Sequence, residues 1–249
     1  GAPPAPPGAA PPPGLGGGPR AGLLGGGFAC LAPGELAPAA AVAALARGVE
    51  ALEAEGWPAT FILVFDEAWA LLERAAALVR EASGNEPNLD VLAWKVDPAR
   101  GQGGFSPHRD RQPADVAGSF RADGSARYVT CWVALSDATP ENSCLYCVPA
   151  AADPGYAAGD RDDVDPLTRA LGGNKESYQL IRALPCEAGG AVVFTHRLIH
   201  WGSRSSAGGA TGGGGRRSGA EAGGGHGRAR GGSSGGARGA SFIFIVMNL

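Results

Sequence analysis

The chain has 249 residues with a formal net charge of -3, and its 42 glycines and 20 prolines make up about a quarter of it. The glycine-rich parts show no Gly-X-Y period, which excludes a collagen-like protein. No apolar stretch approaches the about 18 residues that span a bilayer, so we expect neither a transmembrane helix nor a membrane partner. Because the glycine-rich parts carry several arginines, the rest of the chain is acidic, which disfavours a duplex-binding surface.

The glycines and prolines are unevenly distributed, with more than half of them in residues 1–27 and 205–237. This composition predicts a disordered tail at 1–27 and a disordered insertion at 205–237, within a single domain that spans residues 28–249. The remaining residues are enough to bury one hydrophobic core. The five cysteines are an odd number in a chain too long to need disulfides, and the tail lacks the layout of a secretory signal. We therefore expect an intracellular protein, in the cytoplasm or in an organelle.

Two helices are expected first along the chain. Residues 35–55 repeat apolar side chains at intervals of three and four, which is typical of an amphipathic helix. A short apolar run at 60–65 precedes Asp66, which can cap a second helix that ends at about Ala82.

Short strands separated by turn residues are expected in the rest of the chain. The expected strands span residues 91–96, 128–135, 144–148, 179–184, 191–195 and 241–247. Two helices followed by many short strands indicate a mainly β fold in which a helical layer packs on a barrel or sandwich. Because the strands do not alternate with helices, a doubly wound nucleotide-binding fold is disfavoured.

The candidate metal ligands are histidines, of which the chain has four. His108 and Asp110 form a His-x-Asp unit, and residues i and i+2 of an extended segment point to the same side, so both can reach one metal ion. The unit is weak evidence alone. A Gly-Gly turn and an apolar strand lead to His196 and His200. Two histidines and one carboxylate form the facial triad of non-haem Fe(II) oxygenases.

The order of these pieces resembles a known family. The His-x-Asp unit is followed by YVTCWVALSDATPENSCLYCVP at 128–149, by the Gly-Gly turn and its strand, by HRLIHWGS at 196–203 and by an arginine before a terminal strand. This order resembles the phytanoyl-CoA dioxygenase family of Fe(II)- and 2-oxoglutarate-dependent oxygenases. The resemblance covers roughly residues 57–204 and 238–247.

The resemblance implies a fold and an activity. The implied fold is a double-stranded β-helix with helices on its outer face. The implied enzyme is a hydroxylase that uses Fe(II), 2-oxoglutarate and O₂, acts on a small organic substrate such as an acyl-CoA or another metabolite, and releases succinate and CO₂. By the same resemblance His108, Asp110 and His200 are the metal ligands, and His196 is the alternative to His200.

Further site residues follow from the resemblance. Arg238 matches the arginine that pairs with the distal carboxylate of 2-oxoglutarate, and Ser241 can add a hydrogen bond. Thr130 and Trp132 alternate on one face of their strand as candidate pocket-lining residues. Independently of the resemblance, Lys95 is a third candidate, with packing in the core or at the rim as its default role.

One spacing departs from the family, because Arg238 lies much farther from His200 than the family pattern requires. The insertion at 205–237 explains the gap, since loop-closure entropy grows slowly with length. The assignment of the arginine stays open among four residues of this region. These are Arg216, Arg217, Arg230 and Arg238.

Two other functions are alternatives to the hydroxylase. Residues 149–152, Pro-Ala-Ala-Ala, stand where the family has Pro-Gly-Ser-His, and Ser143 stands where it usually has glycine. These departures leave room for an inactive binding module. Residues 227–232, GRARGG, resemble RNA-binding RGG segments but lack interleaved aromatic residues, so nucleic acid is not the expected partner.

Overall fold

The computed structural model describes residues 18–97, 102, 104–110, 116–142, 144–161, 163–173, 175–202 and 242–248. The strands are β1 (Phe28–Leu31), β2 (Val91–Val96), β3 (Val129–Ala134), β4 (Leu145–Val148), β5 (Arg182–Leu184), β6 (Ala191–Thr195), β7 (Ile199–Gly202) and β8 (Phe242–Asn248). The α-helices are α1 (Gly18–Gly26), α2 (Ala39–Ala54), α3 (Asp66–Ser83), α4 (Val116–Ser119), α5 (Gly155–Ala158) and α6 (Pro166–Leu171). The 3-10 helices are η1 (Ala59–Val64), η4 (Ala150–Ala152) and η5 (Glu176–Leu180).

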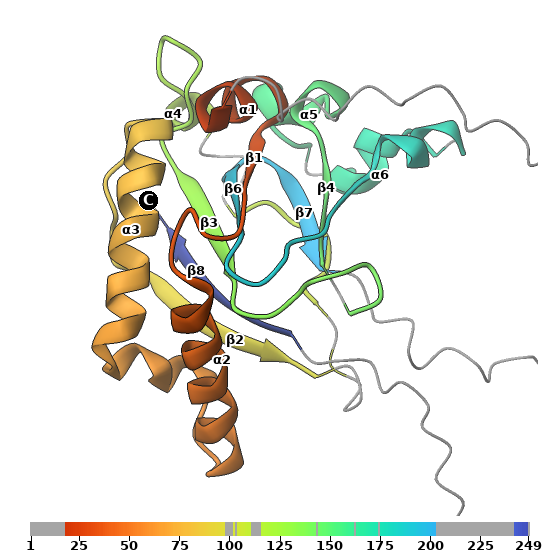
Figure 1. Ribbon diagram of the computed structural model, residues 1–249. Helices are drawn as coiled ribbons and strands as arrows, with labels where there is room; N and C mark the ends of the chain where they lie inside the picture. The colour runs from red at the N-terminus through yellow and green to blue at the C-terminus, as the bar shows by residue number, and fades with distance from the viewer. Residues whose placement is uncertain are drawn as a thin grey trace, which may run out of the picture.

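Two antiparallel sheets form the centre of the molecule (Figure 1). The larger sheet has the order β1-β6-β3-β8-β2, and the smaller has the order β5-β4-β7. Side chains of both sheets meet in one buried cluster, in which Trp132 and Phe244 of the larger sheet accompany Leu145 and Cys147 of the smaller. This arrangement is the double-stranded β-helix that the sequence predicts.

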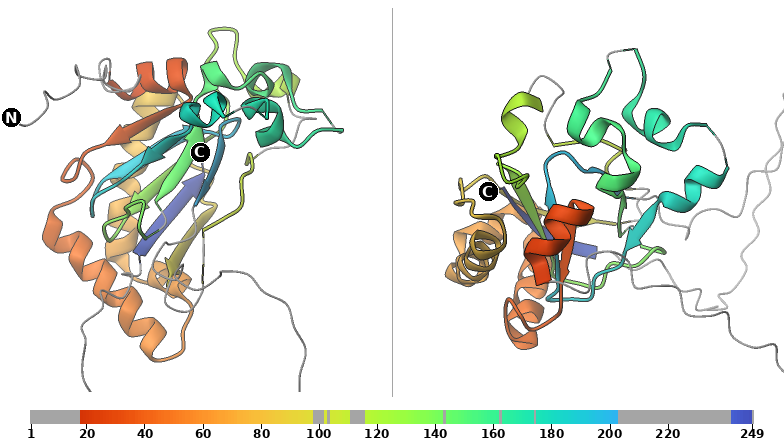
Figure 2. Two further views of the ribbon diagram at one scale, coloured as in Figure 1. Left: turned by 90° about the vertical axis from the view of Figure 1, so that its right-hand side faces the viewer. Right: turned by 90° about the horizontal axis from the view of Figure 1, so that it is seen from above.

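A helical layer covers the outer face of the larger sheet. Leu45 and Val49 of α2 and Leu71 of α3 pack in one buried cluster with Cys131 and Val133 of β3. Seen from above, α2 and α3 lie on one side of this sheet and the segment with α5 and α6 lies on the other (Figure 2). Strand β3 is therefore buried on both faces, which explains its continuous apolar sequence.

The end of the tail that composition predicts as disordered is ordered. Residues 18–26 form α1, in which Leu23 is buried, and residues 28–31 form β1, which pairs with β6. A Cβ atom at Gly22 would lie 2.7 Å from the carbonyl oxygen of Phe28. Glycine thus allows α1 to pack closely on β1, and composition alone does not separate this use from flexibility. Residues 1–17 and 205–237 lie outside the described part of the chain, so their disorder stays a prediction.

Most of the expected elements are confirmed, with small shifts. The two expected helices correspond to α2 and α3, and five of the six expected strands lie within two residues of their predicted bounds. The strand expected at 179–184 is only partly present, because η5 extends to Leu180 and the paired strand, β5, begins at Arg182. Among the helices of the described residues, none has the length and apolarity to cross a membrane.

The helical layer gives a first prediction. Leu71 is 2% exposed, so Leu71→Ala removes buried methyl groups and leaves a cavity between α3 and the sheet. We expect a loss of about 2–5 kcal/mol in the free energy of unfolding, measured by urea denaturation. Glu73→Ala, at an exposed position of the same helix, is the control and should change it by less than about 0.5 kcal/mol. Equal losses in the two variants would contradict the packing described.

Candidate metal centre

Backbone pairing brings the two histidine motifs together. The His108 amide donates to the His200 carbonyl (3.1 Å), and the His200 amide donates to the His108 carbonyl (3.0 Å). The Asp110 amide also donates to the carbonyl of His196, where the chain crosses from β6 to β7 (3.1 Å). Residues 108 and 200 are thus held side by side although they are far apart in sequence.

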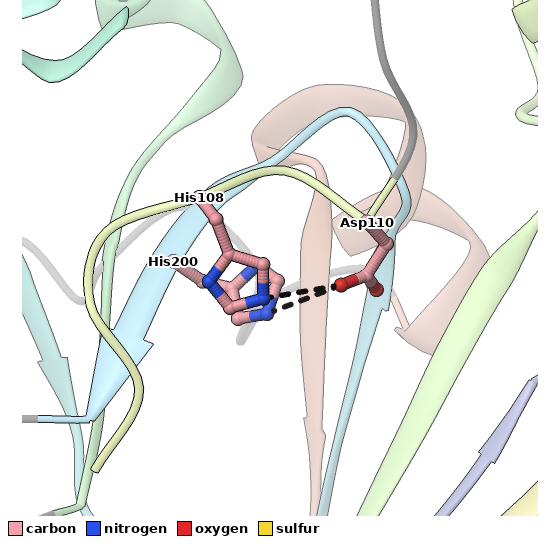
Figure 3. A group of neighbouring side chains, drawn as sticks. All are labelled: His108, Asp110 and His200. Atoms are coloured by element: carbon pink, nitrogen blue, oxygen red, sulfur yellow. Dashed lines mark ion pairs between the residues drawn. The ribbon is translucent and has the colours of Figure 1, made fainter. Parts of the chain in front are cut away.

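Three side chains converge at this point (Figure 3). One ligand atom each from His108, Asp110 and His200 lies within 4.8 Å of the other two. The Nε2 atoms of both histidines are 3.5 Å from the same oxygen of Asp110, Oδ1. The three donors are close enough to share one metal ion.

Hydrogen bonds set the tautomers of the two histidines. The Nδ1 atom of His108 is 2.8 Å from the carbonyl oxygen of Ser106, and that of His200 is 3.1 Å from the carbonyl oxygen of Leu198. A carbonyl oxygen only accepts, so each Nδ1 carries the proton and each neutral ring directs its Nε2 lone pair toward Asp110. Two imidazole lone pairs and a carboxylate oxygen then face one another, and a cation between them would offset their repulsion. The donor set therefore fits a divalent metal ion.

The protonation states also suit metal binding. Burial lowers the pKa of His200, which favours its neutral form. Burial opposes ionisation of Asp110, but its hydrogen bonds and the nearby histidines outweigh this and lower its pKa. The Asp110 carboxylate raises the pKa of His108, because it would accept a hydrogen bond from Nε2 when that atom is protonated, although burial acts in the other direction. Because ligands must be deprotonated to bind metal, an ionised Asp110 and a neutral His200 are already in the required forms.

Thr130 supports the carboxylate from β3. Its hydroxyl is 2.5 Å from Asp110 Oδ2 and donates to it, while Oδ1, the other oxygen, faces the histidines. The Thr130 hydroxyl also lies 3.0 Å from Asn248 Oδ1, and the Asn248 side-chain amide donates to Asp90 Oδ2 (2.8 Å). The sequence analysis did not identify Asn248 or Asp90. The signal available for Asn248 was a polar residue at the end of an apolar strand, and the structure adds that this residue pairs in register with Thr130.

The three side chains line a cavity of about 400 Å³ between the sheets. Thr130 and Trp132, both expected in the pocket, line it together with Phe194 and Phe244. Partly exposed apolar side chains form another part of the wall. These are Leu92, Trp94, Phe105 and Tyr128.

The structure corrects the expectation for Lys95. Its Nζ atom is 3.0 Å from Glu53 Oε2, so it pairs with α2 on the outer face of the sheet. Neighbouring residues of a strand point to opposite faces, and here Trp94 is the one that lines the cavity.

The other expected site residues divide into two groups. His196 lines the same cavity, but its Nδ1 atom is 2.8 Å from the Tyr128 carbonyl oxygen, and it is not part of the three-residue cluster. Arg238, Ser241 and the other three candidate arginines lie outside the described residues. The RGG-like segment and Ser143 lie outside them as well.

A comparison with protein families decides the classification. The family model "Phytanoyl-CoA dioxygenase (PhyH)" matches residues 35–210. The chain belongs to the phytanoyl-CoA dioxygenase family. The resemblance seen in the sequence is thereby confirmed, and membership makes the chain a dioxygenase-type oxidoreductase. A search of curated proteins found no match.

Solved structures share the fold at low sequence identity. The α-ketoglutarate-dependent epimerase SnoN from nogalamycin biosynthesis has a TM-score of 0.58 and 16% identity, over 92% of this chain and 78% of its own. AviO1 from Streptomyces viridochromogenes Tue57 has a TM-score of 0.55 and 20% identity, over 91% of this chain and 90% of its own. HygX from Streptomyces hygroscopicus, solved with iron bound, has a TM-score of 0.56 and 14% identity, over 91% and 83%. These similarities support the double-stranded β-helix of this family member.

The cluster predicts how single substitutions change metal affinity. Losing a contact that merely supports a ligand costs about 10–100-fold in affinity, so losing a ligand in His108→Ala, Asp110→Ala or His200→Ala should raise the Kd for Mn(II) at least about 100-fold. Anaerobic calorimetric titration measures this Kd. The fourth histidine, His226, lies in the glycine-rich segment 205–237, outside the proposed ligand set. His226→Ala is therefore the matched histidine control and should bind as wild type does. If His196→Ala abolishes binding and His200→Ala does not, the third ligand is His196.

Proposed function

We propose that this family member is a dioxygenase that uses Fe(II), 2-oxoglutarate and O₂ to hydroxylate a small organic substrate, with release of succinate and CO₂. The observation that carries the proposal is the His108, Asp110 and His200 cluster at the wall of a cavity lined mainly by apolar surface. Two histidines and one carboxylate are the ligand set of non-haem Fe(II) oxygenases.

Each part of the cavity has a role in this proposal. The three ligands would hold Fe(II), and such a triad would leave room beside the metal for the co-substrate and O₂. When bound, iron and 2-oxoglutarate would supply, with O₂, the oxidising power to hydroxylate a C–H bond. Trp132, Phe194 and Phe244 exclude water around the reacting groups, and Thr130 holds Asp110 in its orientation.

The cavity wall supports a substrate with an apolar body. The rings of Trp94 and Phe105 pack edge to face with centroids 5.0 Å apart, and Phe105 lies 6.1 Å from the ring of His108. A substrate that lies against these rings would present a C–H bond near the metal. The similar structures include an epimerase and a carbocyclase, so the shared fold does not fix the type of reaction. Hydroxylation by this chain is therefore part of our proposal. An acyl-CoA or another metabolite is the substrate class we propose.

The first test of the proposal needs no substrate. Adding 2-oxoglutarate to the anaerobic Fe(II) protein should produce the visible charge-transfer absorption of an iron-bound 2-oxo acid, and admitting air should release succinate. Asp110→Ala and His200→Ala should show no such band and at least about 100-fold less succinate, because they cannot hold the iron. His226→Ala should match wild type. Absence of the band in wild type, or equal bands in all variants, would overturn the proposal.

The co-substrate arginine makes a separate prediction. We propose that Arg238, four residues before β8, pairs with the distal carboxylate of 2-oxoglutarate, assisted by Ser241. A charge-assisted hydrogen bond contributes about 1.5–3 kcal/mol, so Arg238→Gln should raise the Kd for 2-oxoglutarate about 10–150-fold without changing the Kd for the metal. Titration of the charge-transfer band measures it. Arg216→Gln, Arg217→Gln and Arg230→Gln are the controls, and a large effect in one of them would reassign the role.

A further inference from the structure

The residue between the first two ligands, Arg109, points away from them into the protein. Its side chain is 3% exposed and forms bidentate ion pairs with two aspartates whose side chains are also buried. Its Nη1 and Nη2 atoms donate to Asp153 (2.6 and 3.1 Å), and its Nε and Nη2 atoms donate to Asp160 (both 2.7 Å). Its Nη1 atom also donates to the backbone carbonyl of Arg197. All five N–H groups of the guanidinium are therefore engaged.

The same cluster contains the segment that carries the third ligand. Arg197 lies between the two histidines of HRLIH, and its side chain is fully buried. It donates to the carbonyl oxygens of Gly155 (2.9 Å) and Tyr156 (3.3 Å), and it lies 3.8 Å from Asp160. Arg109 thus connects three segments, namely 108–110, 196–200 and 153–160.

The space around the cluster is closely fitted. A Cβ atom at Gly155 would lie 2.6 Å from Arg109 Nη2 and 2.6 Å from Asp160 Oδ1, so only glycine leaves room for the guanidinium here. The two arginines and two aspartates balance in formal charge. The cluster is a defined arrangement with one geometry for each ion pair.

Stability alone is a weak reason for such a cluster. Burying charges requires their desolvation, and replacing a buried ion pair by apolar residues of similar volume is often neutral or stabilising. The ion pairs instead impose a fixed geometry, because each bidentate contact sets the position and the plane of the guanidinium. Because Arg109 is joined to both His108 and Asp110 through the backbone, fixing Arg109 fixes the two ligands.

We propose that Arg109, clamped by Asp153 and Asp160, is a positioning residue that sets the distance between the His108 and Asp110 pair and His200 before the metal binds. The inference rests on the metal site of the proposed function. A ligand set held in place by its neighbours binds metal tightly, because the protein spends no binding free energy on ordering it. The clamp lies on the side of the ligand segment away from the cavity, so it touches neither metal nor substrate.

The test separates positioning from mere stabilisation. Arg109→Lys keeps the positive charge but cannot form the bidentate contacts of the guanidinium. Asp160→Asn keeps one oxygen acceptor and loses the ion pair. Both variants should raise the Kd for Mn(II) about 10-fold or more in anaerobic titrations. They should also change the visible absorption of bound Co(II), which reports the geometry of the ligands.

The control is Leu71→Ala, whose thermal unfolding is recorded in the metal-free state beside that of both clamp variants. Leu71 lies in the helical layer, so its loss lowers stability without touching the clamp. Its Kd and Co(II) spectrum should equal those of wild type. If Arg109→Lys does not fold, Asp160→Asn alone decides the matter.

Two outcomes overturn the inference. Wild-type affinity and an unchanged Co(II) spectrum in the clamp variants would show that Arg109 is only structural, as would a loss no larger than that of Leu71→Ala. Failure of the wild-type protein to bind Mn(II) at all would instead contradict the proposed function. The two failures are thus told apart by the wild-type titration.

Discussion

The candidate site depends on one short stretch of antiparallel pairing. Four backbone hydrogen bonds join the segment 105–110 to the segment 196–202, and they include both bonds between His108 and His200. Side chains on paired extended segments have fixed directions, so this pairing places two imidazoles on one side without any metal. The rest of the fold holds this pairing in place. The smaller sheet supplies β7, and the turn after β6 carries the chain to it.

The site is built from groups that accept hydrogen bonds. With each Nδ1 proton donated to a carbonyl oxygen, the atoms that face the centre are two imidazole lone pairs and the Asp110 carboxylate. These groups repel one another when no cation lies between them, which raises the free energy of the folded state. A bound metal ion therefore stabilises the folded chain over the unfolded one. Behind the ligands, the charges of Arg109 and Arg197 balance those of Asp153 and Asp160. The acceptor-rich centre and the neutral ion cluster lie on opposite sides of one short segment.

The sequence alone predicts the parts of the site that are local. The period of two places His108 and Asp110 on one side of their segment, and the order of motifs points to His200. The sequence does not predict which face of β2 lines the cavity, because VLAWKV is apolar at most positions. The pairing of β2 with β8 decides that Trp94, and not Lys95, lines the cavity. Local pattern carries no information on such long-range pairing. The contacts of Arg109 with Asp153 and Asp160 could not be predicted from local sequence either, since the two aspartates are more than 40 residues away.

The position of β8 has a consequence for how the molecule is made. This strand is the last of those that the structure describes, yet it lies inside the larger sheet, between β3 and β2, and it supplies Phe244, Val246 and Asn248 to the cavity wall. During synthesis β2 precedes β8, its partner in the described sheet, by about 150 residues. Pairing over such a separation is slow to form. The apolar edges of β2 and β3 that pair with β8 therefore remain open to solvent, and to chaperones, until β8 has been synthesised.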